Sequence, residues 1–230
     1  MPEDPLPLPH ERAWPARWIP NEDPPEGQRA AFHRLAAAIR RTTDVLMDRD
    51  ISEDELNAAA DAAEHFAERL AMSPRGRTLW GWAEASNAGD QRSHFDSSPL
   101  IGQANPIAPP MVLWPGGEGV EGTVTFGNAY EGPPGHCHGG FVAAAFDEVL
   151  GMVQSSTGNP GMTGTLTVRY RRPTPLHRPL RFAGKVDRVE GRKIFTSATL
   201  HDGDTLCAEA EGIFISVGFG RFQEMAQKRE

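Results

Sequence analysis

The chain has 230 residues, enough for one average domain with an extension but too few for a large multidomain assembly. Hydrophobic residues make up 39% and charged residues 23%, which favours a soluble globular protein with a buried core over a disordered chain. The net charge of −8 argues against a general nucleic-acid binder, because it would repel the phosphate backbone.

Neither a membrane span nor a secretory leader is expected. No window approaches the roughly 18 apolar residues that cross a bilayer, and the first ten residues carry acids and prolines where a signal peptide needs a basic start and an apolar run. Cys137 and Cys207 are too few for a disulfide framework, so reduced thiols are expected. These features together predict a cytoplasmic protein.

The first half of the chain predicts an extended arm and two helices. Residues 1–25 hold eight prolines, which disfavour regular structure there. In residues 26–110, apolar side chains recur at steps of three and four up to about position 47 and predict an amphipathic helix. Ser52 and Glu55 form a capping box that begins a second helix, and an irregular connection follows from residue 74. We expect a helical hairpin that serves as a lid or an oligomer contact, or else docks a partner.

Residues 111–220 predict a domain with one buried helix and several strands, and residues 221–230 are expected to form a C-terminal tail. A loop dense in glycine and proline leads into an apolar segment typical of a buried helix. Alternating and β-branched residues around it predict short strands, and the pair Asp202 and Gly203 is typical of a hairpin turn. The helix is expected over 140–153 and the strands over 111–114, 120–126, 162–172, 179–189, 193–201 and 205–217.

The start of this buried helix is the first candidate for chemistry. Gly139 and Gly140 leave the backbone amides of its first turn unobstructed, at the positive end of the helix dipole. Such amides stabilise a developing oxyanion without a charged side chain. The same two glycines would also suit a tight loop with close packing, so the pattern alone leaves both interpretations open.

Asp147 is the second candidate, because an ionised carboxylate in an otherwise apolar helix is costly without a partner or a function. The alternative is that Asp147 and Glu148 mark a solvated face. Asp147 lies eight residues after Gly139, about 12 Å along a helix axis, which is too far for both to flank one carbonyl. If both act on one substrate, two chains must contribute, with their helices antiparallel about a two-fold axis.

The order of motifs resembles the hotdog-fold acyl-CoA thioesterases, in the branch of phenylacetate-pathway and THEM-type enzymes. The resemblance rests on HisGlyGly at 138–140, an aspartate nine residues after the histidine, and MetThr at 162–163 leading a strand into TyrArgArgPro at 170–173. It covers about residues 111–217. It implies an α+β hotdog fold, a long helix wrapped by a curved antiparallel sheet, carrying the N-terminal hairpin as an extension. It also implies a homodimer or a dimer of dimers with active sites across the interface.

The resemblance also assigns roles by position. Asp147 is expected to activate water or attack the thioester, Gly139 or Gly140 to donate to the carbonyl, Thr163 to hold the attacking water, and His138 to shape the site. Alternatively, Thr163 is an ordinary threonine at the edge of a strand, and His138 is a histidine that caps the loop. An acyl chain would occupy a tunnel between paired helices, with Phe141 and Phe146 among its lining, and medium to long aliphatic chains are favoured.

The basic segment fits an acyl-CoA substrate. Residues 161–200 hold nine lysines and arginines against two acids, and Arg169, Arg171 and Arg172 are candidates for the phosphates of coenzyme A, although a charge-balanced strand face is the plain alternative. No cofactor is expected, because coenzyme A is part of the substrate. A metal site at His136, Cys137 and His138 is rejected, since neighbouring side chains in an extended segment point apart.

The sequence therefore predicts a thioester hydrolase that releases a free acid and coenzyme A. A non-catalytic acyl-CoA binding or sensing protein with the same cleft is the main alternative. A hotdog dehydratase is a third, but the spacing from HisGlyGly to Asp147 matches the thioesterases better.

Overall fold

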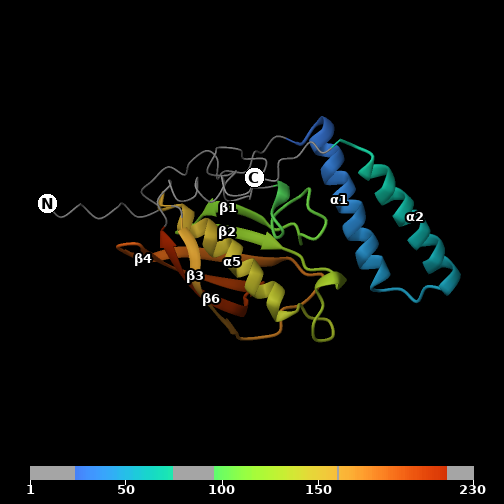
Figure 1. Ribbon diagram of the computed structural model, residues 1–230. Coiled ribbons are helices and arrows are strands. Elements are labelled where there is room, and N and C mark those ends of the chain that lie inside the picture. The colour runs from blue at the N-terminus through green and yellow to red at the C-terminus, as the bar shows by residue number, and fades with distance from the viewer. Residues whose placement is uncertain (1–23, 75–95, 160, 217–230) are drawn as a thin grey trace.

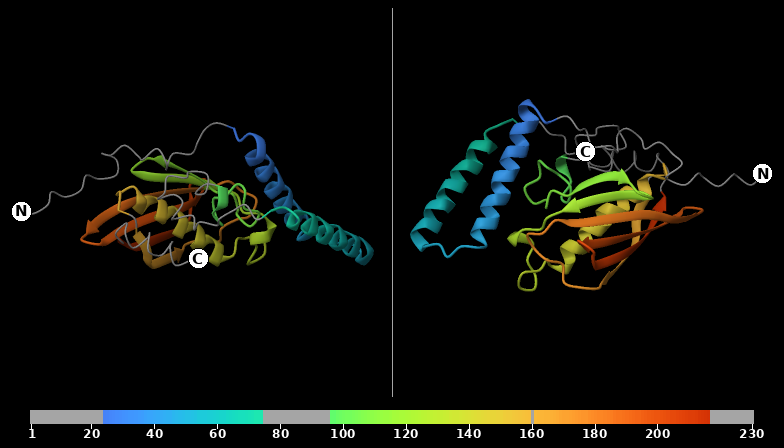
Figure 2. Two further views of the ribbon diagram at one scale, coloured as in Figure 1. Left: turned by 45° about the horizontal axis from the view of Figure 1, so that its top comes forward. Right: turned by 180° about the vertical axis from the view of Figure 1, so that it is seen from behind.

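The computed structural model describes residues 24–74, 96–159 and 161–216 (Figure 1). Most of the expected N-terminal arm, the first part of the irregular connection and the C-terminal tail lie outside these ranges. The described residues form an α+β structure in which one long helix lies across an antiparallel sheet and two further helices stand to one side (Figures 1 and 2). The fold class predicted from the sequence is confirmed.

The two helices of the predicted hairpin are α1, Gly27–Leu46, and α2, Glu53–Ala71. The capping box forms as expected, because the Ser52 hydroxyl accepts a hydrogen bond of 3.3 Å from the Glu55 amide. The helices run side by side in both views, with α1 next to the sheet domain and α2 outside it (Figure 2). The hairpin therefore meets the rest of the chain through α1.

The sheet has six antiparallel strands in the order β1-β2-β4-β5-β6-β3. Their bounds, within a few residues of the predicted ones, are β1 Val112–Gly116, β2 Gly119–Val124, β3 Gly161–Tyr170, β4 Leu180–Glu190, β5 Lys193–Asp202 and β6 Thr205–Ser216. The predicted turn between β5 and β6 has Gly203 at a φ of 56°, a backbone conformation that glycine adopts without steric cost. β3 pairs only with β6 and is an edge of the sheet.

The predicted buried helix is α5, Gly139–Ser155, and the sheet curves around it (Figure 1). One face of α5 carries Val142, Phe146, Val149 and Val153, whose side chains are buried against the inner face of the sheet. The ring of Phe146 packs edge-on against Phe182 of β4, with centroids 5.2 Å apart. This packing fixes which face of α5 points away from the sheet and is free to carry polar groups.

The described part of the irregular connection attaches α1 to the sheet domain. Asp96 is 5% exposed and accepts hydrogen bonds from Arg29 at 2.7 and 3.2 Å and lies 2.7 Å from Nε2 of His33. Further along α1, the Arg40 guanidinium donates to the carbonyls of Gln103 and Asn105, at 3.3 and 2.8 Å. A buried carboxylate needs such partners, and here they hold α1 in place.

Candidate active site

The first turn of α5 has one amide left open. The His138 side chain caps the helix, since its Nδ1 accepts from the Gly140 amide at 3.0 Å. The His138 carbonyl accepts from the amides of Phe141 and Val142, at 3.0 and 3.3 Å. Within the described ranges no acceptor lies on the Gly139 amide. Of the two glycines expected to bind an oxyanion, Gly139 is therefore the one whose amide is unoccupied.

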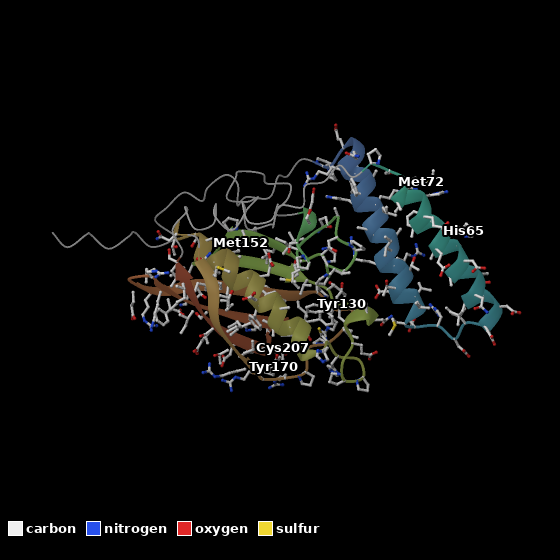
Figure 3. The ribbon with its side chains drawn as sticks, viewed as in Figure 1. His65, Met72, Tyr130, Met152, Tyr170 and Cys207 are labelled. Carbon is white, nitrogen blue, oxygen red and sulfur yellow. The ribbon has the colours of Figure 1, made fainter. Side chains whose placement is uncertain are left out.

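Tyr170, at the end of β3, fixes this turn from the side. Its hydroxyl donates a hydrogen bond of 2.8 Å to the Gly139 carbonyl, and its ring packs against Gly139 where a Cβ would lie. Figure 3 shows Tyr170 near the N-terminal end of α5 and Met152 near the opposite end. From the sequence, Tyr170 is predicted only to belong to a strand-end motif, with no role in the site. Tyr170 therefore fixes the carbonyl side of Gly139, the residue whose own amide is open.

His138 is exposed at the entrance to α5, with its ring 6.3 Å from that of Phe141. Because Nδ1 accepts from the Gly140 amide, the neutral imidazole carries its proton on Nε2. His138 thus combines the loop-capping role, the plain alternative from the sequence, with a donor facing outward. The two interpretations do not exclude each other.

Asp147 and Thr163 meet on the face of α5 that points away from the inner sheet. The Thr163 hydroxyl donates a hydrogen bond of 2.9 Å to Oδ1 of Asp147. Asp147 is half-buried and Thr163 is exposed. The register between β3 and β6 shifts between Thr163 and Thr165, a β-bulge that re-aims side chains locally. The structure therefore brings together two residues that the sequence analysis placed in one site.

Gly139 and Asp147 belong to the same uninterrupted helix, α5. At 1.5 Å per residue, about 12 Å of helix separates them, as the sequence spacing predicted. One copy of the chain therefore presents an open amide and a carboxylate–hydroxyl pair at two separate places. The two halves cannot act on the same carbonyl within a single chain.

Glu148, next to Asp147, is a buried carboxyl, so the alternative that Asp147 and Glu148 mark a solvated face is wrong for Glu148. It is 9% exposed, and burial raises the pKa of Glu148 to about 7, with the neighbouring charge of Asp147 adding to the shift. A hydrogen bond with Ser98 opposes this shift. Ser98 itself accepts from the amides of Leu100 and Ile101, so its own proton is left for the carboxylate.

The three arginines proposed for phosphate contacts differ in their surroundings. Arg169 forms an ion pair of 2.7 Å with Glu211, and Arg171 pairs with Glu209, both acids on the neighbouring strand β6. Arg172 has no ion-pair partner among the described residues. Two of the three thus fit the charge-balanced strand face, and Arg172 is left as the arginine free to meet an anion.

The two aromatic candidates for the acyl site also separate. Phe141 is 39% exposed and lies on a cavity of about 790 Å³ between α5 and α1. Phe146 is fully buried in the core and is not part of that cavity's lining. Val149, Leu150 and Met152 are buried in the same core.

The remaining candidate groups are inert in this setting. Burial raises the pKa of the Cys137 thiol to about 12, which removes it as a nucleophile, and Cys207 is also buried and unpaired. In the described ranges no three His, Cys, Asp or Glu side chains are placed to hold a metal ion. None of the helices there combines the length and the apolar character needed to cross a bilayer.

Comparisons with known proteins identify the family of the chain. The sequence model of the family described as Thioesterase superfamily matches residues 134–209, which include the start of α5, Asp147 and Thr163. The chain is 40% identical over 89 residues to acyl-coenzyme A thioesterase THEM4 of Xenopus laevis. It is 30% identical over 93 residues to acyl-coenzyme A thioesterase THEM5 of Homo sapiens. The matches cover 38% and 40% of this chain and only 40% and 38% of these curated relatives.

A solved structure gives a match over nearly the whole chain. The crystal structure of a thioesterase superfamily protein superimposes with a TM-score of 0.75 at 33% sequence identity, over 91% of this chain and all of that one. The match extends well beyond the 134–209 segment. Because this relative is 33% identical and is covered over its full length, the chain belongs to the thioesterase superfamily.

Proposed function

We propose that this protein is an acyl-CoA thioesterase, which hydrolyses the thioester of a fatty acyl-CoA to a free acid and coenzyme A. The observation that carries the proposal is the hydrogen bond of 2.9 Å between Asp147 and the Thr163 hydroxyl. Asp147 lies on α5, the helix that begins with the open Gly139 amide. The names of the THEM4 and THEM5 relatives, acyl-coenzyme A thioesterases, support the substrate class.

The reaction needs no metal in this proposal. The thioester carbonyl oxygen accepts a hydrogen bond from the Gly139 amide at the positive end of α5. Asp147 takes a proton from a water molecule held with Thr163, and the hydroxide attacks the carbonyl carbon. The tetrahedral intermediate collapses, the carbon–sulfur bond breaks, and coenzyme A leaves as a thiolate that is then protonated. The acyl group departs as the free acid.

The site is completed by a second copy of the chain. Because about 12 Å of helix separates Gly139 from Asp147, the amide of one subunit and the aspartate of the other act on one substrate. The unpaired outer side of β3, which carries Thr163 close to this face, offers backbone groups to a partner. A homodimer is the smallest assembly with both halves, and a dimer of dimers is compatible with it.

The surrounding residues take supporting roles. The outward Nε2 proton of His138 is suited to the carbonyl or the attacking water. Arg172, which unlike Arg169 and Arg171 has no ion-pair partner among the described residues, is suited to a phosphate of coenzyme A. The sequence-based preference for medium to long aliphatic chains and for a cytoplasmic location stays a prediction.

Steady-state hydrolysis of CoA thioesters from acetyl to palmitoyl, together with phenylacetyl-CoA, tests the proposal. The purified protein is expected to release coenzyme A from fatty acyl-CoA, and Asp147→Asn to lower kcat by at least about a hundredfold with unchanged folding. Asp204→Asn, in the exposed turn before β6, is the control and keeps full activity.

Near-normal turnover by Asp147→Asn contradicts the assigned role. Acyl-CoA binding without turnover by the native protein points instead to a binding or sensing protein with the same cleft.

A further inference from the structure

A cavity of about 790 Å³ lies between α1 and the sheet domain. Of its lining, only Phe141 and Ala144 fall within residues 134–209, the segment that the family's sequence model matches. Its inner wall comes from α5 and from the 3-10 turn Asn128–Tyr130, and includes Phe141, Ala144 and Tyr130. Its outer wall is α1, with Ala37 and Arg40, closed by the proline-rich segment 99–110. Figure 3 shows Tyr130 on the side of α5 that faces α1.

The cavity has the size and the surface of a site for an apolar small molecule. Its volume falls in the range of about 300–1,000 Å³ that such sites occupy. Its lining is mostly hydrocarbon, from four prolines, Leu100, Ile107 and the two aromatic rings. The rings of Tyr130 and Phe141 stand edge to face with centroids 5.0 Å apart, and the Tyr130 hydroxyl is used on the Ile107 carbonyl. Hydrophobic contact is therefore what this wall offers.

Some of the polar groups of α1 at the cavity already have hydrogen-bond partners, whereas the side chain of Arg41 also lines the cavity and adds a positive charge there. The Arg40 guanidinium donates to the carbonyls of Gln103 and Asn105, and partial burial lowers the pKa of Arg40. Asp44 packs against Gly127 so closely that a Cβ there would have no room, and its carbonyl accepts from the Asn128 side chain. Most of the lining is nevertheless hydrocarbon, so the cavity is best suited to an apolar group, with Arg41 as a cation on its α1 side.

One wall of the cavity includes a residue from the same helical turn as the proposed oxyanion donor. Phe141 lies in its wall and is two residues after Gly139, whose amide is the proposed oxyanion donor. The Phe141 ring also faces the His138 ring, 6.3 Å away. The group attached to a carbonyl bound at Gly139 is therefore the candidate that we consider for filling the cavity, because Phe141 of the same turn lines it.

We propose that this cavity binds the acyl chain of the substrate, a medium to long aliphatic chain, and that α1 of the N-terminal extension is the wall that sets its length. The inference rests on the proposed function. It differs from the tunnel expected from the sequence, because Phe146, Val149 and Leu150 lie in the core and Phe141 lies at the cavity.

Substitutions that fill the cavity from two opposite walls test this assignment. Ala37→Trp on α1 and Ala129→Phe on the 3-10 turn both add bulk at exposed positions of the lining, so neither disturbs the core. Each is expected to raise KM for dodecanoyl-CoA and palmitoyl-CoA by at least about tenfold, with kcat/KM for acetyl-CoA unchanged. Ala38→Trp, at the next exposed position of α1 and not in the lining, is the matched control and keeps the native chain-length profile.

Calorimetric binding of S-dodecyl-CoA, a thioether that cannot be hydrolysed, separates failure of this inference from failure of the proposed function. If the native protein hydrolyses no acyl-CoA but binds the thioether, and Ala37→Trp weakens that binding about tenfold, the cavity assignment holds without the activity. The assignment is overturned if the filled variants keep the native chain-length profile, or if Ala38→Trp changes it equally. The assignment is also overturned if Ala37→Trp weakens the binding of free coenzyme A as much as the binding of the thioether, since the cavity would then hold the pantetheine arm. Absence of thioether binding overturns it as well.

Discussion

The hydroxyl of Thr163 donates a hydrogen bond of 2.9 Å to the carboxylate of Asp147, which joins the edge strand β3 to the outward face of the central helix. The β-bulge between Thr163 and Thr165 lies at this point of the strand, where the local register with β6 changes. The contact constrains the orientation of the carboxylate before any substrate binds, as pre-organised catalytic groups require.

Loss of this hydroxyl is expected to slow the chemical step more than it weakens binding. In Thr163→Val, the side chain keeps its shape but no longer holds Asp147 or a water molecule beside it. A fall in kcat of about 10- to 100-fold with KM within about threefold is expected, because small misplacements of a reacting group are costly. Steady-state kinetics with dodecanoyl-CoA measures both constants.

Two variants control for effects on the strand itself. Thr163→Ser retains the hydroxyl and is expected to recover most of the native kcat. Thr165→Val makes the same change on the other side of the bulge, at another exposed position, and leaves kcat unchanged. Equal losses in Thr163→Val and Thr165→Val would mean that the strand, and not the contact with Asp147, is being disturbed.

The buried Glu148 carboxyl predicts a pH-dependent stability. Burial raises the pKa of Glu148 from 4.5 to about 7 in the folded protein, so the native state holds this proton more tightly than the unfolded chain does. The stabilisation from the bound proton is fully present below pH 4.5 and is lost as the pH rises through about 7. Glu148→Gln removes the ionisation. As the pH rises from 4.5 to above 7, the free energy of unfolding of this variant is therefore expected to increase relative to that of the native chain, by up to about 3 kcal/mol.

Urea unfolding of both proteins between pH 4.5 and 8 measures this difference. Ser98→Ala provides a second check, because it removes the hydroxyl that favours the ionised carboxylate. That variant loses stability at every pH from the lost bonds to Leu100 and Ile101, while its pH-dependent fall moves to higher pH. Stability curves of the native chain and Glu148→Gln that stay parallel across the window would contradict a raised pKa.

Much of the fold could be predicted from local pattern. The Ser52 capping box, the period of α1 and the alternation of β5 are properties of neighbouring residues, and these elements form close to the expected positions. The Gly139-to-Asp147 separation could also be predicted, because a helix has a fixed rise per residue. The partner of Asp147 came from the family resemblance, since Thr163 lies 16 residues away on a different element.

Contacts between distant segments could not be predicted. Tyr170 reaches Gly139 across 31 residues, and the pattern around Tyr170 is that of an ordinary strand end. Phe141 and Phe146 look alike in sequence, yet the helix turns one toward α1 and the other into the core. Asp96 stands in a segment without periodicity, and its role is set by α1, 63 residues earlier. Such pairings depend on tertiary packing, to which a one-dimensional pattern gives no access.

Asp96 predicts how the N-terminal extension is attached. Its buried carboxylate bonds Arg29 and His33, and the Arg29 pairing raises the pKa of the Arg29 guanidinium. Removing one partner of a buried ion pair lowers the free energy of unfolding by about 3–5 kcal/mol. Because Arg29 and His33 are partly exposed, the loss expected for the Asp96 pair is about 3 kcal/mol or less. In Asp96→Ala, amides of α1 are expected to exchange hydrogen faster by a factor of about a hundred, while those of β5 keep their protection.

Asp48→Asn is the matched control, because Asp48 pairs with Arg49 at 3.8 Å on the exposed end of the same hairpin, where an ion pair contributes less than about 1 kcal/mol. It leaves exchange in α1 unchanged. Since α1 is the proposed wall of the acyl site, detaching it in Asp96→Ala must also reduce the preference for dodecanoyl-CoA over acetyl-CoA. If hydrogen exchange in α1 becomes faster but the preference for dodecanoyl-CoA stays, the hairpin is attached through Asp96 but does not form the acyl site. If hydrogen exchange in α1 is unchanged, the contacts of Asp96 do not hold α1.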